Sequence, residues 1–408
     1  MKRLAFSLLL LLSTLAYAGE KVLYTFQGGT DGFLPNAALI QDQAGNFYGT
    51  TYYGGDLSCV PSDGCGTVFE LSPDGHGGWT EAVLYRFAGG ADGQNPVAGL
   101  ILDGQGNLYG TSALGAKCPK NCGSVFELSP QGGSWKFTIL HTFKGGTDGQ
   151  YPDGGLLMDS AGSLYGTTIS GGASSRGLAF RLANTNGAWK LKKLYSFSGG
   201  TDGGDPAGTL VFGSDGSIYG LTLYGGAYGQ GVLYKVFINV KGNWKEKVLY
   251  SFKGGKSGAH PYGLSLDSAG KLYGFATNTP GWGFVFQFSQ NRTGKWSKKD
   301  IYKLGQPRGG GPSGPRGGLL VDAGGNVFGM AGGGITPSSG TLYKLTPQAD
   351  GKFAETLLYS FQGGSDGIGP NGPPIMDASG NLYGVTAAGG GGCSGLASGC
   401  GTVFEFTP

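Results

Sequence analysis

Five aspartates recur at one place in successive segments of the chain, each in a "GTDG"-like motif. A carboxylate in such a motif can form an Asx turn that accepts hydrogen bonds from nearby backbone amides. The alternative is a ring of carboxylates that holds a structural cation or sugar hydroxyls. We favour the turn, because the equivalent place in a later segment is Ser257 and carries no acid. The five aspartates, which we keep as candidate ligand-binding residues, are Asp31, Asp92, Asp148, Asp202 and Asp366.

A second group of residues departs from the repeating pattern and is able to bind a ligand. Exposed aromatic rings on a rigid loop are common platforms for sugars or peptides, although loop aromatics also pack against neighbouring elements. One asymmetric ligand needs unequal neighbours, so we expect the site where the repeat is broken. The candidates are Tyr224, Tyr228, His260, Trp282, Arg308 and Arg316.

The six cysteines form three local couples, each separated by only a few residues. Only three histidines exist and none lies beside a couple, which makes a metal site a poor interpretation. We therefore predict three short disulfides and no metal or cofactor beyond the cation considered above. The predicted pairs are Cys59 with Cys65, Cys118 with Cys122, and Cys393 with Cys400.

The element that must position these residues is a repeat, of which "YSFKGG" from Tyr250 is one near-copy. A spacing of 52 to 61 residues is typical of propeller blades rather than of leucine-rich or helical repeats. No segment has a helical period, and each unit contains four short extended segments separated by tight turns. The repeats start at Leu23, Leu84, Leu140, Leu194, Leu249, Ile301 and Leu358.

These features predict an all-β, seven-bladed β-propeller with four antiparallel strands in each blade. The chain opens with a lone fourth strand, "KVLYTF" from Lys21, and ends with segments of the first three types. We therefore expect the N-terminal strand to complete the C-terminal blade and to remove two open sheet edges.

Alternate turns of a four-stranded meander lie on opposite rims of the propeller. The crossing loop between blades and the loop between the second and third strands should therefore share one face. This face receives the cysteines, the five aspartates and the residues that break the repeat. The opposite rim receives tight turns that we interpret as structural, at Asp42, Asp103, Asp159, Asp267, Asp322 and Asp377.

Residues 1–18 have the pattern of a signal peptide, with Lys2 and Arg3 before an apolar run and small residues at Ala16 and Ala18. We therefore expect an exported, periplasmic or extracellular monomer in which residues 19–408 form one domain. No later stretch approaches the roughly 18 apolar residues that span a bilayer. The formal net charge of +3 gives no basis for a nucleic-acid partner.

The assembled unit "LYSFKGGTDGxxPxAGLIxDxxGNLYGTTxxGGxxxxGTVFELSP" resembles the GloVer tandem repeat of exported bacterial proteins over about residues 21–408. A fainter similarity is to kelch blades, in which a double glycine closes the second strand and a tryptophan opens the fourth. Here Gly54 and Gly55 precede Trp79 in that way. The resemblance implies export and strand order but no particular activity.

No nucleophile elbow, phosphate loop or zinc spacing stands apart from the repeat, so catalysis is not the favoured interpretation. We predict a binding or interaction module whose ligand at the loop rim is a carbohydrate or a peptide. Two alternatives remain open. One is a polysaccharide-active hydrolase or lyase that uses the channel mouth, and the other is a structural cell-surface or matrix protein.

Overall fold

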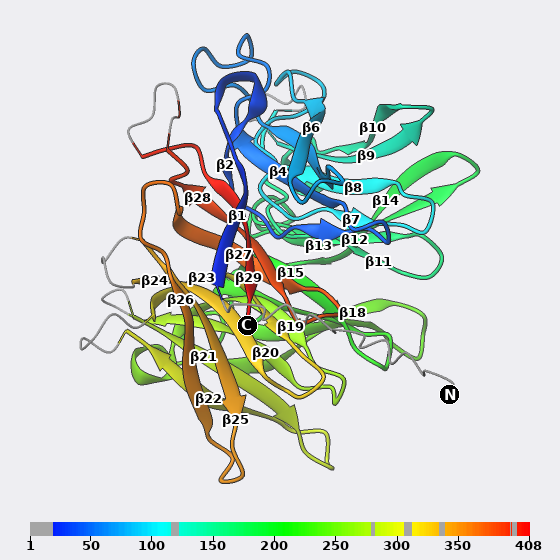
Figure 1. The fold of residues 1–408 in the computed structure, drawn as a ribbon. Coiled ribbons are helices and arrows are strands. Elements are labelled where there is room, and N and C mark those ends of the chain that lie inside the picture. The colour runs from blue at the N-terminus through cyan, green and yellow to red at the C-terminus, as the bar shows by residue number, and fades with distance from the viewer. Residues whose placement is uncertain are drawn as a thin grey trace, which may run out of the picture.

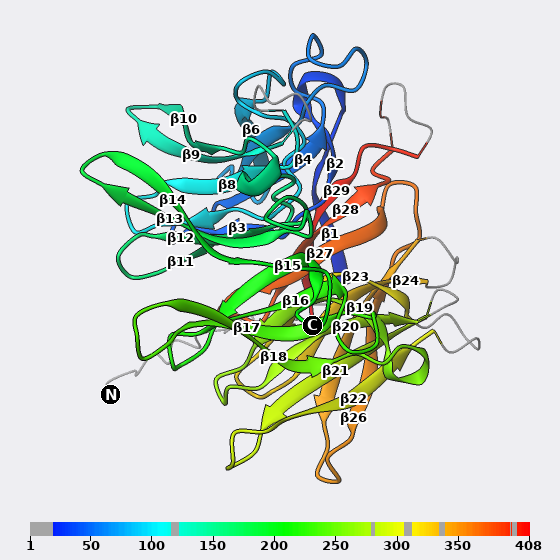
Figure 2. The same cartoon turned by 180° about the vertical axis from the view of Figure 1, so that it is seen from behind.

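The computed structural model describes residues 19–115, 122–278, 282–305, 312–333, 339–391, 393 and 398–408. The predicted signal peptide, Cys118 and Arg308 lie outside the described residues, as do the side chains of Trp282 and Arg316. The described residues form seven antiparallel sheets, which confirms the predicted all-β propeller. Figures 1 and 2 show these blades following one another around the molecule, with the first strand beside the last. No helix in the described ranges is long and apolar enough to cross a membrane.

In six blades the strands follow chain order from the inner strand to the outer strand. Blade 1 comprises β2 (Phe33–Pro35), β3 (Ile40–Gln41), β4 (Phe47–Tyr53), β5 (Thr67–Pro73) and β6 (Trp79–Arg86). Blade 2 comprises β7 (Ile101–Leu102), β8 (Leu108–Ser112), β9 (Ser124–Gln131) and β10 (Ser134–Thr142). Blade 3 comprises β11 (Leu157–Met158), β12 (Leu164–Thr168), β13 (Leu178–Thr185) and β14 (Ala188–Ser196).

The remaining blades have longer inner strands. Blade 4 comprises β15 (Gly204–Phe212), β16 (Ile218–Tyr224), β17 (Val232–Ile238) and β18 (Trp244–Ser251). Blade 5 comprises β19 (Ala259–Leu266), β20 (Leu272–Asn278), β21 (Trp282–Gln290) and β22 (Trp296–Leu304). Blade 6 comprises β23 (Pro312–Val321), β24 (Val327–Gly333), β25 (Thr341–Pro347) and β26 (Phe353–Ser360). Blade 7 comprises β27 (Ile368–Met376), β28 (Leu382–Ala388), β29 (Thr402–Thr407) and β1 (Gly19–Thr25).

The ring closes through blade 7, as the strand count predicts. Strand β1 pairs antiparallel with β29 from Gly19 opposite Thr407 to Thr25 opposite Thr402. Both strands would otherwise present unpaired backbone groups at a sheet edge. The N-terminal strand therefore completes the sheet formed by the last three strands of the chain.

The repeated aromatic motif packs the blades together. Tyr24 and Phe26 lie two residues apart, and their rings meet edge to face with 5.3 Å between centroids. The phenylalanine of this motif is fully buried in the six blades that carry it. Each outer strand also has a β-bulge at the apolar residue before the aromatic one, as at Leu23. The bulge adds a residue to the outer strand, which locally increases its twist.

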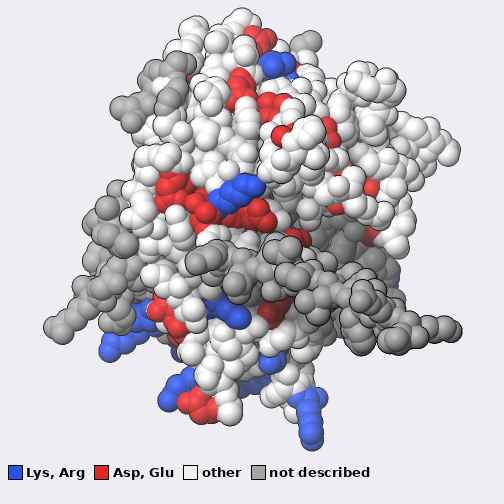
Figure 3. Space-filling view, in the orientation of Figure 1, with Lys and Arg blue, Asp and Glu red and all other residues white. Residues whose placement is uncertain are grey.

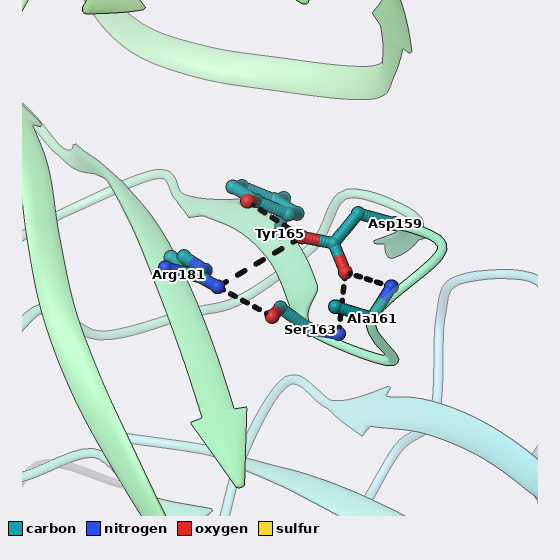
Figure 4. A network of polar contacts seen from close by, with 5 residues as sticks. All are labelled: Asp159, Ala161, Ser163, Tyr165 and Arg181. Atoms are coloured by element: carbon teal, nitrogen blue, oxygen red, sulfur yellow. Dashed lines mark hydrogen bonds and ion pairs between the residues drawn. The ribbon is translucent and has the colours of Figure 1, made fainter.

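The rim that carries the loops between first and second strands is called the turn rim here, and Figure 4 shows its repeating network in blade 3. Asp159 Oδ1 accepts hydrogen bonds from the amides of Ala161 and Ser163 at 3.0 and 2.8 Å. Its Oδ2 accepts one from the Tyr165 hydroxyl at 2.9 Å. The bond from the amide four residues along recurs at Asp42, Asp103, Asp267, Asp322 and Asp377, which confirms the predicted turns.

Glycines bring the inner strands close together around the axis. A Cβ added to Gly317 would lie 2.3 Å from the Cα of Gly372 in the next blade, and both residues have positive φ. In blade 2 the inner strand is only Ile101–Leu102, and a Cβ added to the preceding Gly99 would lie 3.3 Å from the carbonyl oxygen of Ala38 in blade 1. The blades therefore meet backbone to backbone at the axis.

Candidate functional site

The crossing loops between blades and the loops between second and third strands share one face, called the crossing rim here. A Cβ added to Gly28 in the crossing to blade 1 would lie 2.8 Å from Cys400 Sγ. At Gly89, in the next crossing, the corresponding distance to Cys59 Sγ is 2.2 Å. Each of these crossing loops therefore rests on the cysteine loop of the blade that it leaves.

The disulfides lie on this rim. Cys59 is bonded to Cys65, and Cys393 to Cys400, as predicted. Cys122 is also disulfide-bonded, while its predicted partner Cys118 lies outside the described residues. Disulfides persist in oxidising compartments, so the two described pairs are consistent with such an environment.

The five recurring aspartates hold the crossing loops in shape. Asp31 accepts hydrogen bonds from the Tyr24 hydroxyl at 3.0 Å and from the Gln27 amide at 2.6 Å. The same two contacts, from the aromatic residue seven positions earlier and the amide four positions earlier, occur at all five. Each carboxylate therefore serves its own loop, and Asp31, Asp92, Asp148, Asp202 and Asp366 are all absent from the lining of the channel cavity described below.

Three of these aspartates face a glutamate from the outer strand of the next blade. Burial and the Asp31 charge raise the pKa of Glu81 to about 8. Burial and Asp366 raise the pKa of Glu20 in the same way to about 8, and burial and Asp202 raise that of Glu246 to about 7. Ionising both carboxyl groups of such a pair is unfavourable, because the two negative charges repel each other. The crossing rim therefore contains three carboxyl pairs between blades that favour holding a proton.

Two of the repeat-breaking residues lie together between blades 4 and 5. The rings of Tyr224 and His260 meet at a tilt, with 4.8 Å between centroids. His260 Nδ1 lies 2.9 Å from the carbonyl oxygen of Leu223. Tyr224 and Tyr228 are 46% and 53% exposed, and Lys253 Nζ lies 5.6 Å from the centre of the Tyr228 ring. We call Tyr224, Tyr228 and His260 the blade 4 platform.

The other predicted residues are placed only by their backbone or not at all. Trp282 begins β21 opposite Asn278, at the crossing-rim end of that strand, and Arg316 lies in β23 opposite Met330. Arg308 lies outside the described residues. The structure therefore brings Tyr224 and His260 into contact, with Tyr228 in the same loop region, and leaves the grouping of the other three as a prediction.

The axis of the propeller contains a cavity of about 460 Å³. It is lined by residues from the inner strands or inner segments of all seven blades, mostly alanine, glycine and leucine. Leu223, whose carbonyl contacts His260, also lines it. The cavity therefore adjoins the blade 4 platform, and its volume is in the range of sites for small ligands.

The most varied position in the cavity wall is the residue that follows a proline in each blade. From blade 1 to blade 7 these residues are Asn36, Val97, Asp153, Ala207, Tyr262, Arg316 and Asn371. The first five line the cavity, and the Asn371 side-chain amide donates a hydrogen bond to Asn36 Oδ1. The seven blades thus carry six different residue types at this one position, and we call these seven residues the post-proline ring.

Sequence reasoning missed this ring, although a signal was present. A proline occurs at the same place in all seven copies, and the residue after it has six different identities. The predicted binding residues were expected in loops, whereas this position belongs to the inner segment of each blade. At the post-proline ring the backbone position is the same in each blade, while the side chain changes.

Asp153 is the acidic residue among the described residues that line the cavity. No hydrogen bond or ion pair joins it to another described residue. Its side chain is open to the channel, yet surrounding protein atoms bury it enough to raise its pKa. A carboxyl group with a pKa perturbed by burial inside a cavity is a common mark of a functional site.

The residue before each proline holds the inner strand to the previous blade. At Asp205 and His260 this residue has positive φ (55° and 47°), and its amide donates to Arg176 O and Gln230 O respectively. Positive φ is costly for residues other than glycine and persists where the surroundings enforce it. The same conformation occurs at Leu34, Asn95 and Tyr151. A common backbone thus presents five different side chains at one level of the channel mouth.

Metal ligation receives no support from the described side chains, among which no group of three or more histidine, cysteine, aspartate or glutamate residues could hold an ion. The face seen in Figure 3 is mainly uncharged, with acidic and basic side chains in small groups. The described residues of the candidate site therefore comprise exposed aromatic rings, an apolar channel wall and the Asp153 carboxyl group.

The fold and site define a seven-bladed β-propeller with an asymmetric channel. The family model of the Gloeobacter/Verrucomicrobia repeat matches residues 12–157 and 116–298, and the chain belongs to this family. A comparison with curated proteins finds no match.

Similar solved structures share the fold. One is a protein from Lactobacillus plantarum, with a TM-score of 0.55 and 16% identity over 78% of this chain and 84% of that one. A GH74 xyloglucanase from Xanthomonas campestris has the same TM-score and identity over 91% of this chain and 52% of its own. An ancestral GH74 enzyme has a TM-score of 0.54 and 12% identity, covering 92% and 51%. At identities this low, the similarity indicates a shared fold and gives no information about activity.

Proposed function

We propose that this protein is an exported binding module that holds a carbohydrate or a peptide on its crossing rim. The observation that supports the proposal is the blade 4 platform, in which Tyr224 and Tyr228 expose half of their surface beside the channel mouth. Tyrosine offers a large, rigid contact surface together with a polar hydroxyl, which suits sugars and peptides alike. The contact of Tyr224 with His260 holds one side of this surface in place.

The rigidity of the rim supports the same proposal. Disulfides close the loops beside two blades, and aspartates fix the crossing loops through hydrogen bonds. A surface that is already ordered loses little conformational entropy when it binds a ligand. Such a rim is suited to recognition without a large change of shape.

The enzyme alternative would need a second acidic group near Asp153. Most glycoside hydrolases use two carboxyl groups about 5 to 9.5 Å apart on either side of the scissile bond. Among the described residues of the cavity wall, Asp153 is the acid that is present, and no second one lines the cavity. The described site therefore fits binding better than hydrolysis.

The test is a glycan and peptide array, followed by titration of the best ligand against variants. We expect Tyr228→Ala to weaken binding about tenfold, the usual loss at an aromatic hot spot. Ile238→Ala is the matched control, because Ile238 is similarly exposed, at 57%, but ends strand β17 toward the turn rim. Equal losses in the two variants, or no bound ligand on either array, would contradict the proposal.

A further inference from the structure

We propose that the channel cavity binds a primary ammonium group on a short aliphatic stem, with the Asp153 carboxylate as its counter-ion. This site goes beyond the rim function, because it uses Asp153 and the described wall of the cavity and not the blade 4 platform. It is therefore testable when no rim ligand is known.

The first observation is the position of the carboxyl group. Asp153 follows Pro152 in the inner segment of blade 3 and lines the cavity together with Gly155 and Leu156. No described residue supplies a hydrogen bond or an opposite charge to it. The side chain is open to the channel and no described residue neutralises its charge, so an arriving cation would find an unpaired carboxylate at the cavity wall.

The second observation is the chemistry of the wall. Val97, Ala98, Leu100, Leu156, Ala207 and Leu223 line the cavity beside Asp153. Aliphatic walls favour a methylene stem over a ring covered with hydroxyls, because each buried methylene contributes hydrophobic stabilisation. Tyr262 lines the same cavity and adds an aromatic ring, a group that attracts cations when its face is accessible.

Other ligand classes fit the cavity less well. An anion would be repelled by the carboxylate, and a divalent metal requires six to eight oxygen ligands, or about six in near-octahedral geometry. A compact ammonium with three donors needs only one charged partner and a few oxygens around it. Asn36 and Thr209 carry side-chain oxygens in the same wall, and Asn36 Oδ1 also accepts a hydrogen bond from Asn371.

Other titratable and charged groups also bear on the pH dependence. Tyr52 of blade 1 interacts electrostatically with Asp153, and burial together with neighbouring charges, that of Asp153 included, raises the pKa of Tyr52. Arg316 occupies the blade 6 position of the ring, and its side chain lies outside the description. At the mouth, Asp205 pairs with Arg176 at 3.5 Å, and His260 contacts Leu223 O. Because burial raises the pKa of Asp153, we expect ammonium affinity to be constant at neutral pH and to fall as the pH drops through that raised value.

The ammonium has two possible sources, a free amine or a lysine side chain of a peptide. We would titrate 1,5-diaminopentane and Nα-acetyl-lysine methylamide into the full mature chain by calorimetry. Binding of the diamine alone would indicate a small amine, and binding of the lysine derivative would indicate a peptide. Nε-acetylated lysine has the same stem without the charge and should not bind.

The decisive variant is Asp153→Asn, which we expect to weaken binding of the amine about tenfold or more. Asp205→Asn makes the same chemical change at a carboxylate that already has Arg176 as its partner, and should leave the affinity within about twofold. Tyr228→Ala should also leave amine binding unchanged, which separates this site from the rim platform.

Three results would overturn the proposal. They are the absence of binding of both amines at millimolar concentration, equal affinity in Asp153→Asn and the natural chain, and affinity that does not change between pH 8 and pH 4. The pH series uses the natural chain, so it remains decisive if the Asp153→Asn variant does not fold.

Discussion

The turn rim and the channel mouth of this propeller differ in what is repeated from blade to blade. On the turn rim the side chains repeat, because an aspartate accepts the same amide hydrogen bond in blade after blade. At the channel mouth, on the crossing rim, the backbone repeats while the side chains change. The residues before the prolines share a positive φ and an amide bond to the previous blade, yet they include leucine, asparagine, tyrosine, aspartate and histidine.

This difference separates the requirements of the fold from those of binding. A hydrogen-bonded turn needs one acceptor at one place, so an aspartate at the same position serves six of the seven blades. A single asymmetric ligand needs unequal contacts, and a sevenfold ring supplies them only where its copies diverge. The turn rim therefore identifies the structural frame, and the channel mouth identifies the candidate site.

The largest effect on stability should come from removing β1, the strand that closes the ring. Deleting residues 19–25 removes β1 and its pairing with β29, and it exposes the blade 7 edge. We expect the melting temperature to fall by more than about 10 °C, with aggregation, as measured by thermal unfolding and size-exclusion chromatography. A monomeric product with an unchanged melting temperature would show that the ring does not depend on this closure.

The next effect tests the turn rim alone. Asp103 accepts hydrogen bonds from the amides of Gln105 and Asn107, from the Asn107 side chain and from the Tyr109 hydroxyl. Asp103→Ala should therefore lower the free energy of unfolding by about 2 kcal/mol, measured by chemical denaturation. Asp205→Asn, on the crossing rim, should change it by less than about 0.5 kcal/mol. Similar values for the two variants would remove the distinction between the rims.

A third prediction uses the opposite acid–base behaviour of the rims. Burial would raise the pKa of Asp103 and Asp377, but hydrogen bonds from Asn107 and Asn381 outweigh it and lower the pKa of each. Folding thus favours the charged form, and this stabilisation is lost as the pH falls through the lowered values. On the crossing rim, the pKa of Glu20 and that of Glu81 are raised to about 8, so folding favours the protonated form. That stabilisation is lost as the pH rises from the ordinary value of 4.5 through about 8.

The melting temperature should therefore pass through a maximum in mildly acidic solution and fall on both sides. Glu81→Gln should flatten the decline at higher pH, because the amide cannot ionise. Asp103→Asn should flatten the decline at lower pH. A melting temperature that rises steadily from pH 5 to pH 9 would contradict the assignment of the protonated carboxyl pairs.

The smallest effect on stability is expected at the blade 4 platform. Tyr228 is 53% exposed, so Tyr228→Ala should change the free energy of unfolding by less than about 0.5 kcal/mol. Tyr250→Ala is the contrasting variant, because Tyr250 packs edge to face on Phe252 with 5.3 Å between centroids. It should cost a few kcal/mol, about as much as other large-to-small core changes. A large loss in Tyr228→Ala would mean that the platform belongs to the core.

Much of the fold could be predicted because the same strand and turn patterns recur in seven units of the sequence. The period indicated a propeller, and the count of strand types indicated closure through "KVLYTF". The local couples gave two disulfides that the structure describes. The bulge at Leu23 could not be predicted, because Val22, Leu23 and Tyr24 are all compatible with a strand and the sequence does not show which of them lacks a partner.

By itself, the sequence determined what local chemistry controls: turns at the aspartates, strands by their period of two, and pairing of cysteines a few residues apart. Only the tertiary structure decided which side chains share the axis. The post-proline residues lie more than fifty residues apart in the chain, and only the closure of seven blades brings them to one cavity. The enclosure that raises the pKa of Asp153 comes from the surrounding blades, and a single repeat does not contain it.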